Sequence, residues 1–281
     1  MKIKILLLCS MFLVNTFLYS QDDSITSVDH SKITLSTDII PAWKVQVEVG
    51  GSSWYSKSEK TYNPGTVSEN TISYYNLRMN LPSLAFRVGV FRNVELRLGL
   101  VFMQEFNRTK LEGNIITFSS SRDNGIYGGG PIEAGVKYNF LERNKYLPEA
   151  SVIVNLFIPA GDYYFHTDFV SPSFKLLLKK EISKNFTIGG NLGYGWNVYD
   201  RFTDKYGNYS IAIDAKISKR LNAFAEVYSY FQYRRTPDHR VGAGFTYQFS
   251  RNVMANIAGG IGLSERSPDL YGSGGIGFMF P

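Results

Sequence analysis

Apolar and polar residues alternate along most of this 281-residue chain. In RVGVFRNVELRLGLVF (87–102), apolar side chains take nearly every second position, and Arg87, Glu95 and Arg97 stand between them. This period of two is that of a β-strand with one apolar and one polar face. The interruption at 91–93 (FRN) predicts a tight turn, so the stretch is expected to form a β-hairpin.

The same alternation recurs in twelve segments, which we expect to be strands with ends set to within a few residues. They lie at roughly 43–55, 73–91, 94–106, 130–140, 149–159, 171–182, 186–197, 208–218, 222–231, 239–249, 253–263 and 270–280. An even number of strands is typical of single-chain bacterial barrels. Near Pro82 the alternation shifts by one residue, which predicts a bulge because proline cannot donate a ladder hydrogen bond.

The connections between these segments alternate in length. Compact turns are expected at 91–93, 141–148, 183–185, 218–222 and 250–252. Longer loops are expected at 56–70, 107–127, 160–170, 198–207, 232–239 and 264–270. Outer-membrane barrels have short periplasmic turns and long external loops, whereas a soluble β-sandwich has no reason to alternate in this way.

Aromatic residues gather near the strand ends on the apolar face. Near the short turns these are Trp43, Tyr138, Phe140, Phe186, Phe249, Phe278 and Phe280, and near the long loops Trp54, Phe102, Tyr194, Trp196, Tyr209 and Phe231. Two aromatic bands around an aliphatic belt match the girdles of a membrane barrel. The sequence therefore predicts an all-β, transmembrane, antiparallel up-and-down barrel of about 12 strands, with its apolar face in lipid and its charged face toward a lumen.

The N-terminus predicts export. Residues 1–20 (MKIKILLLCSMFLVNTFLYS) have a basic start and an apolar run too short for a membrane anchor, so we expect a cleaved signal peptide and a mature start near Gln21. The single cysteine, Cys9, lies within it, so the mature chain has no disulfide. Residues 21–42 match no strand. They are expected to be a periplasmic segment, disordered, or a plug folded into the lumen of the barrel at 43–281.

Composition narrows the class of protein. Aromatic residues make up 15% of the chain, and the formal charge of +6 becomes +4 once Lys2 and Lys4 leave with the signal. This mild excess does not indicate nucleic-acid binding. We predict a protein of the outer membrane of a diderm bacterium, whose partners are the lipid bilayer and a small-molecule solute. The sequence does not set its oligomeric state.

Several stretches resemble one family of barrels. They are GVFRNVELRLGL, GGGPIEAGVKYNFLE followed by LPEASVIVNLFIPAGD, and FAEVYSYF. Together they are similar to the outer-membrane transporters of the MetA-pathway of phenol degradation type, and the resemblance covers about residues 43–280. It implies a β-barrel and uptake of hydrophobic or aromatic compounds, and it carries no catalytic residues onto this chain.

Motifs for catalysis or metal binding are weak. GSGGIG (272–277) has the spacing of a dinucleotide fingerprint but is not followed by a helix. His166 and His239 lie in or beside expected loops without an evident serine partner, and His30 lies in the leader region, so a hydrolase is the least favoured function. We expect no enzyme, no catalytic residue, no cofactor and no metal site.

Charged residues on the inner face are the main candidates for function. By alternation the residues expected to line the lumen are Lys44, Glu48, Arg78, Arg87, Glu95, Arg97, Glu133, Lys137, Lys175, Lys179, Asp214, Lys216, Glu226 and Arg240. They predict either a polar, mildly positive path for solutes or an ion-paired lumen closed to all but water. Both interpretations stay open at this point.

The loop AGDYYFHTDF (160–169) is a second candidate. Tyr163, Tyr164 and Phe165 would either fold inward as a capture site for apolar solutes or continue the outer aromatic band. The leading functional hypothesis is a passive outer-membrane channel or transporter for small, hydrophobic or aromatic solutes. The alternative is a structural or adhesive barrel whose outer loops bind partners.

Overall fold

The computed structural model describes residues 25, 27–29, 32–62, 70–113, 120–165, 169–196 and 205–281. The expected signal peptide, His30 and His166 lie outside these residues. Within them no helix has the length and apolar character needed to cross a membrane. The strands are β1 (Val45–Tyr62), β2 (Asn70–Phe91), β3 (Val94–Gly113), β4 (Ser120–Gly129), β5 (Ile132–Leu141), β6 (Glu149–Ile158), β7 (Ser171–Glu181), β8 (Phe186–Trp196), β9 (Lys205–Lys216), β10 (Leu221–Gln232), β11 (Asp238–Gln248), β12 (Val253–Gly262) and β13 (Leu270–Phe280).

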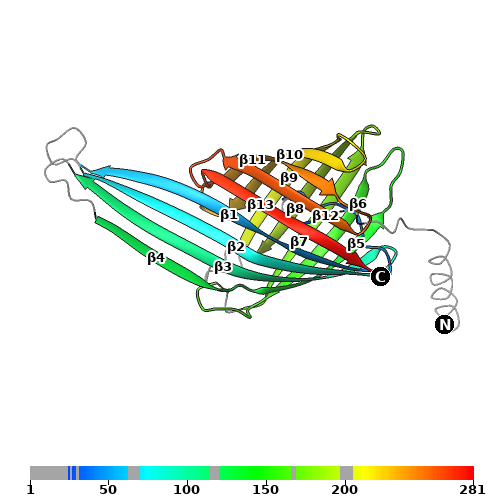
Figure 1. Cartoon of the computed structure of the whole chain (residues 1–281), viewed down its shortest axis with the longest axis horizontal. Helices are drawn as coiled ribbons and strands as arrows, with labels where there is room; N and C mark the ends of the chain where they lie inside the picture. The colour runs from blue at the N-terminus through cyan, green and yellow to red at the C-terminus, as the bar shows by residue number, and fades with distance from the viewer. Residues whose placement is uncertain are drawn as a thin grey trace.

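These strands form one closed antiparallel barrel (Figure 1). Closure is made by β1, which pairs with β2 on one side and with β13 on the other. β4 and β5 share one position in the wall, because β5 pairs with residues 94–99 of β3 and β4 pairs with residues 102–111 of the same strand. The wall therefore has twelve strand positions, and the predicted fold is confirmed.

The two faces of the wall are inverted relative to those of a soluble protein. Leu96 is 46% exposed on the outside, whereas its neighbour Glu95 is fully buried on the inside. The same contrast holds around the barrel, where Phe245 and Ile257 are exposed while Lys137 is buried. An outer surface of this kind suits acyl chains, and a closed ladder leaves no backbone groups unpaired in lipid.

The bulge expected at Pro82 is present. The register between β2 and β3 shifts between Asn80 and Ser83, so that β2 contains one extra residue there. β1 keeps a regular register with β13 through this level. Alternation along β1 therefore places Trp54 on the inner face with Glu48, opposite the buried Tyr271. Its assignment to the outer aromatic band was wrong.

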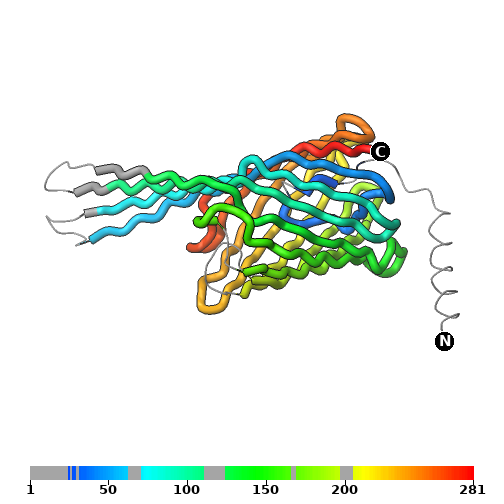
Figure 2. Tube along the Cα trace, turned by 90° about the horizontal axis from the view of Figure 1, so that it is seen from below, coloured from blue at the N-terminus to red at the C-terminus, as the bar shows by residue number. Residues whose placement is uncertain are grey.

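Two of the expected long loops are largely strand. β1 continues to Tyr62 and β2 begins at Asn70, while β3 runs to Gly113 and β4 starts at Ser120, so the loops predicted at 56–70 and 107–127 are wrong. Beyond Tyr55, β1 pairs with β2 and no longer with β13. The result is a sheet of β1 to β4 that projects well beyond the rim of the barrel, which we call the extension (Figures 1 and 2).

Candidate functional site

The described residues between 25 and 42 lie against the inner faces of strands from different sides of the barrel. Asn256 of β12 donates from Nδ2 to the carbonyl of Val28 at 2.7 Å. Ser151 of β6 donates from Oγ to the carbonyl of Thr37 at 2.9 Å. We call these residues the inner segment. Since it is held by strands on different sides, the inner segment crosses the lumen.

Backbone groups of the inner segment also bind buried carboxylates. The amides of Ile33 and Thr34 donate to the two carboxylate oxygens of Glu226 at 3.1 and 2.9 Å. The amide of Ile40 donates to Glu95 at 3.0 Å. An irregular segment inside a barrel must satisfy its amides without a ladder, and these glutamates supply the acceptors.

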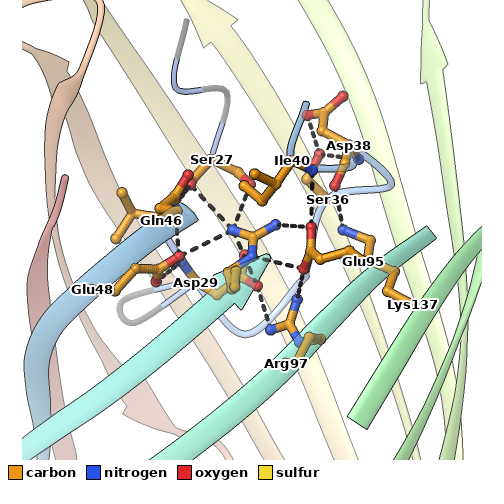
Figure 3. Close-up of polar contacts among 12 residues, drawn as sticks. Ser27, Asp29, Ser36, Asp38, Ile40, Gln46, Glu48, Glu95, Arg97 and Lys137 are labelled. Atoms are coloured by element: carbon orange, nitrogen blue, oxygen red, sulfur yellow. Dashed lines mark hydrogen bonds and ion pairs between the residues drawn. The ribbon is translucent and has the colours of Figure 1, made fainter. Parts of the chain in front are cut away.

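A buried cluster of charges joins the inner segment to β1, β2, β3 and β5 (Figure 3). Arg87 binds Glu95 through Nε at 2.8 Å and through Nη2 at 3.0 Å, and it binds Glu48 through Nη1 at 3.0 Å. All three side chains are fully buried. A two-point contact of this kind is among the strongest charge-assisted hydrogen bonds, and its planar geometry fixes the guanidinium in place.

Asp29 brings the inner segment into this cluster. Its carboxylate lies 2.6 Å from Nη2 of Arg97 and 3.7 Å from Nη1 of Arg87. Its own amide donates to Glu48 at 2.8 Å. Burial alone would raise the pKa of Asp29, but the guanidinium groups of Arg87 and Arg97 outweigh that effect and hold the pKa below its usual value.

Asp38 makes a second ionic anchor on the other side of the inner segment. It pairs with Lys179 of β7, and its backbone carbonyl accepts a hydrogen bond from Nζ of Lys137 at 2.5 Å. Burial would raise the pKa of Asp38, yet the ammonium of Lys179 holds it below its usual value. A third pair joins Lys32 to Asp214 of β9 at 2.6 Å.

Two cavities lie on either side of the inner segment. One, of about 210 Å³, is lined by Lys32, Asp38, Lys179 and Asp214 among others. The second, of about 250 Å³, is lined by residues that include Arg97, Glu133, Asn155 and Lys175. Asp29 and Leu35 line both cavities. The inner segment is therefore the partition between them.

Aromatic rings stand on the inner face nearer the extension. The rings of Tyr206 and Tyr230 are stacked at 4.9 Å. The guanidinium of Arg240 lies 5.7 Å from the ring centres of both Tyr228 and Tyr271. Rings with polar tips offer apolar area and hydrogen-bonding groups together, as an aromatic solute with a polar substituent requires.

The sequence-predicted lumen residues separate into groups. Glu48, Arg87, Glu95, Arg97 and Lys137 meet in the buried cluster, Lys179, Asp214 and Glu226 bind the inner segment, and Glu133 and Lys175 line the second cavity. Arg240 pairs with Asp238 at 2.5 Å. Arg78 lies on the extension, where it pairs with Glu105 at 2.9 Å. Lys216 is exposed at the end of β9, and Lys44 is half-buried just before β1. The solute-lining role of the set remains a prediction.

Sequence reasoning missed the partners that the inner segment supplies. Lys32, Asp29 and Asp38 lie in a stretch without periodicity, so no pattern assigned them a face or a neighbour. Of the loop candidates, Tyr163 and Tyr164 are more than 60% exposed with their ring centres 5.5 Å apart, whereas Phe165 is buried. Capture of a solute there also remains a prediction. Among the described residues no group of three His, Cys, Asp or Glu is placed to hold a metal ion.

The chain is similar to several solved structures, of which one with a TM-score above 0.5 supports the fold. Among solved structures, an outer membrane channel from Pseudomonas putida F1 is 13% identical, with 91% of this chain and 100% of that chain covered and a TM-score of 0.56. The CymD monoaromatic hydrocarbon channel is 10% identical over 85% of this chain and 88% of its own, with a TM-score of 0.44. The toluene transporter TodX of Pseudomonas putida is 9% identical over 84% and 87%, with a TM-score of 0.43.

No match is found among curated protein sequences. The family model described as "Putative MetA-pathway of phenol degradation" matches residues 29–280, which include both the barrel and most of the inner segment. The resemblance found in the sequence is thereby confirmed, and the chain belongs to this family.

Proposed function

We propose that this protein is a passive channel of the outer membrane that admits small hydrophobic or aromatic solutes and is gated by its inner segment. The lipid-facing belt supports the location, since a girdled closed barrel is the form in which β-strands cross a bilayer. The family's description names phenol degradation, which supports an aromatic solute, and the Pseudomonas putida F1 protein of the same fold is described as an outer membrane channel, which supports passage of solutes. The stacked rings of Tyr206 and Tyr230 on the inner face support aromatic solutes in particular.

The main observation that supports gating is the position of the inner segment between the two cavities. Asp29 and Leu35 line both of them, so the inner segment stands between the two cavities, and we propose that it moves to let a solute pass from one to the other. Buried ion pairs that anchor it provide a two-state element, docked or released. In this proposal residues 1–20 are the cleaved signal, 21–42 the periplasmic or plug segment, and 43–281 the barrel.

A disulfide that locks the inner segment tests the gate. Replacing Val28 and Asn256 with cysteine joins two residues whose carbonyl and side chain are already 2.7 Å apart, in a mature chain that has no other cysteine. In planar bilayers we expect the oxidised protein to conduct at least tenfold less than the same protein after reduction. Liposome swelling with neutral, anionic and aromatic solutes should likewise be slower for the oxidised protein than for the reduced one. Comparing the swelling rates of the reduced protein between solutes ranks the solutes.

A matched pair on the outer wall serves as control. Ala225 and Ala243 lie directly opposite each other on β10 and β11, where a disulfide leaves the inner segment untouched. Conductance of that protein should not depend on oxidation. If the Val28–Asn256 protein conducts equally in both states, or if neither state conducts or swells, the gated channel is refuted.

The extension favours a second candidate function, an adhesive barrel. It places aromatic side chains such as Tyr62 and Tyr74 in exposed positions on strands beyond Tyr55, where β1 no longer pairs with β13. The outer edge of β4 carries a row of backbone groups that β3 does not pair, and such edges recruit extended partners. Exchanging 56–72 and 105–126 for short turns should abolish surface binding and preserve conductance if this function is present. Unchanged binding would exclude it.

A further inference from the structure

A serine and a histidine face each other on the outer wall. Ser229 of β10 is the direct cross-strand partner of His239 of β11, and its Oγ lies 2.7 Å from Nδ1 of the imidazole. The expectation that His239 has no serine partner was wrong. The two residues are separated in sequence by the turn between the strands. Both fall within expected strands, at 222–231 and 239–249, but the cross-strand register that places them opposite each other was not predicted.

The pair lies on the lipid side of the barrel. Along β10, Glu226 and Gln232 are buried on the inner face, whereas Val227 and Phe231 are exposed on the outer face. Ser229 has the parity of the outer set. It is close to the end of β10 at Gln232, at the end of the barrel where β1 and β2 continue into the extension. The hydroxyl is therefore placed near the headgroup boundary of the outer leaflet, where the ester bonds of lipids lie.

The backbone of His239 is hydrogen-bonded to its neighbours, and one aromatic ring packs against the imidazole. The amide of His239 donates to Oγ of Ser264 at 3.0 Å, and its carbonyl accepts from the amide of Leu263 at 2.7 Å. The ring of Phe231 packs edge-on against the imidazole at 5.8 Å. The imidazole therefore stands on a fixed backbone and packs against Phe231, with Nδ1 toward the serine.

Ser229 is covered by aromatic side chains that can change conformation. Ser229 is 4% exposed and lies between His239 and Tyr209 in the register of the wall. Tyr209 stacks on Phe231 at 5.7 Å, and both rings are more than a third exposed toward lipid. Exposed side chains change rotamer within nanoseconds, so a carbonyl group gains access when one of these rings turns aside.

The geometry points to a second activity: Ser229 and His239 act as nucleophile and base in the hydrolysis of carboxylic esters of membrane lipids. Oγ attacks the ester carbonyl carbon while its proton passes to Nδ1. The resulting imidazolium returns that proton to the departing alkoxide, which leaves as the lysolipid alcohol. Water then attacks the acyl-serine with His239 as base, releasing a fatty acid and restoring the hydroxyl.

The test uses the purified mature protein reconstituted in phosphatidylethanolamine vesicles. We expect fatty acid and lysolipid in equal amounts, and labelling of Ser229 by a fluorophosphonate, located by mass spectrometry. Ser229→Ala and His239→Gln should each lower fatty-acid release at least hundredfold, as loss of a nucleophile or base does. Ser210→Ala removes a buried strand hydroxyl on the neighbouring strand and should leave release unchanged.

Channel conductance separates this activity from the proposed function and reports folding. Both dyad variants should conduct like the original protein, because Ser229 and His239 face away from the lumen. Release that persists in Ser229→Ala, or an original protein that conducts yet neither reacts with fluorophosphonate nor releases fatty acid, would overturn the proposal. An original protein that hydrolyses lipid without conducting would support the dyad and refute the channel.

Discussion

At the scale of single residues, Arg87 has the largest predicted effect on stability. Replacing it with methionine leaves Glu48 and Glu95 buried without the guanidinium that both contact. Breaking a buried ion pair by removing one partner costs about 3–5 kcal/mol. We expect Arg87→Met to lower the free energy of unfolding by that amount, measured by urea denaturation in lipid vesicles.

Arg78→Met is the matched comparison for this variant. Arg78 also contacts a glutamate, Glu105 at 2.9 Å, but its side chain is 45% exposed on the extension. Exposed pairs contribute about 0–1 kcal/mol, so this change should be nearly neutral. Equal destabilisation by the two variants would mean that the cluster around Arg87 is open to water.

Alternation in the sequence was sufficient to assign these inner residues to a face. It placed Glu48, Arg87 and Glu95 together on the charged side, where the structure has them. It did not identify Asp29, because the inner segment has no period and its position depends on contacts with four strands. The Ser229–His239 pair was missed for a related reason: alternation assigns a face to each residue but does not fix the cross-strand register that sets which residues stand opposite each other.

At the scale of elements, strand prediction succeeded where one face meets lipid. It failed in the extension, where SKSEKTY (56–62) and SSRDNGIYGG (120–129) are polar on both sides. Along β1, residues 57–62 are exposed on both faces, so these polar strands need no alternation. They are held by continuing the ladder of β2 and β3. The pairing of such strands can therefore be predicted only from the strands beside them.

The contact between the inner segment and β2 gives a prediction at this scale. A Cβ on Gly89 would lie 2.2 Å from the carbonyl oxygen of Pro41 and 2.3 Å from that of Ile40. Gly89→Ala should therefore force the inner segment away at a cost of about 1–3 kcal/mol. That corresponds to a released fraction, and a bilayer conductance, roughly 5- to 150-fold higher.

Gly190→Ala is the control for this substitution. A Cβ at Gly190 meets no atom closer than the carbonyl oxygen of Ser210 at 3.6 Å, an ordinary van der Waals contact. The conductance of Gly190→Ala should equal that of the original protein. If Gly89→Ala conducts no better than Gly190→Ala, docking at Gly89 does not control the passage.

At the scale of the whole molecule, the docked inner segment couples the channel to pH. The anchoring carboxylates, Asp29 and Asp38, have pKa values below the usual 3.8 when docked, and a released segment in water regains that value. The released form therefore binds protons more readily than the docked form. These carboxylates stabilise the docked form fully above about pH 5. That stabilisation is lost progressively as the pH falls through 3.8 toward the docked pKa.

Conductance of the reconstituted channel should accordingly be low and constant from about pH 8 to 5 and rise as the pH falls toward about 3. Asp29→Asn cannot ionise at this position and leaves Arg97 without its partner at 2.6 Å. It should conduct more at neutral pH and respond less to acid. A conductance that rises with pH would contradict this prediction, because carboxylates that lose protons on docking favour the docked form as the pH rises. In that case the inner segment is held chiefly by its hydrogen bonds to Glu226, Ser151 and Asn256 rather than by these ion pairs.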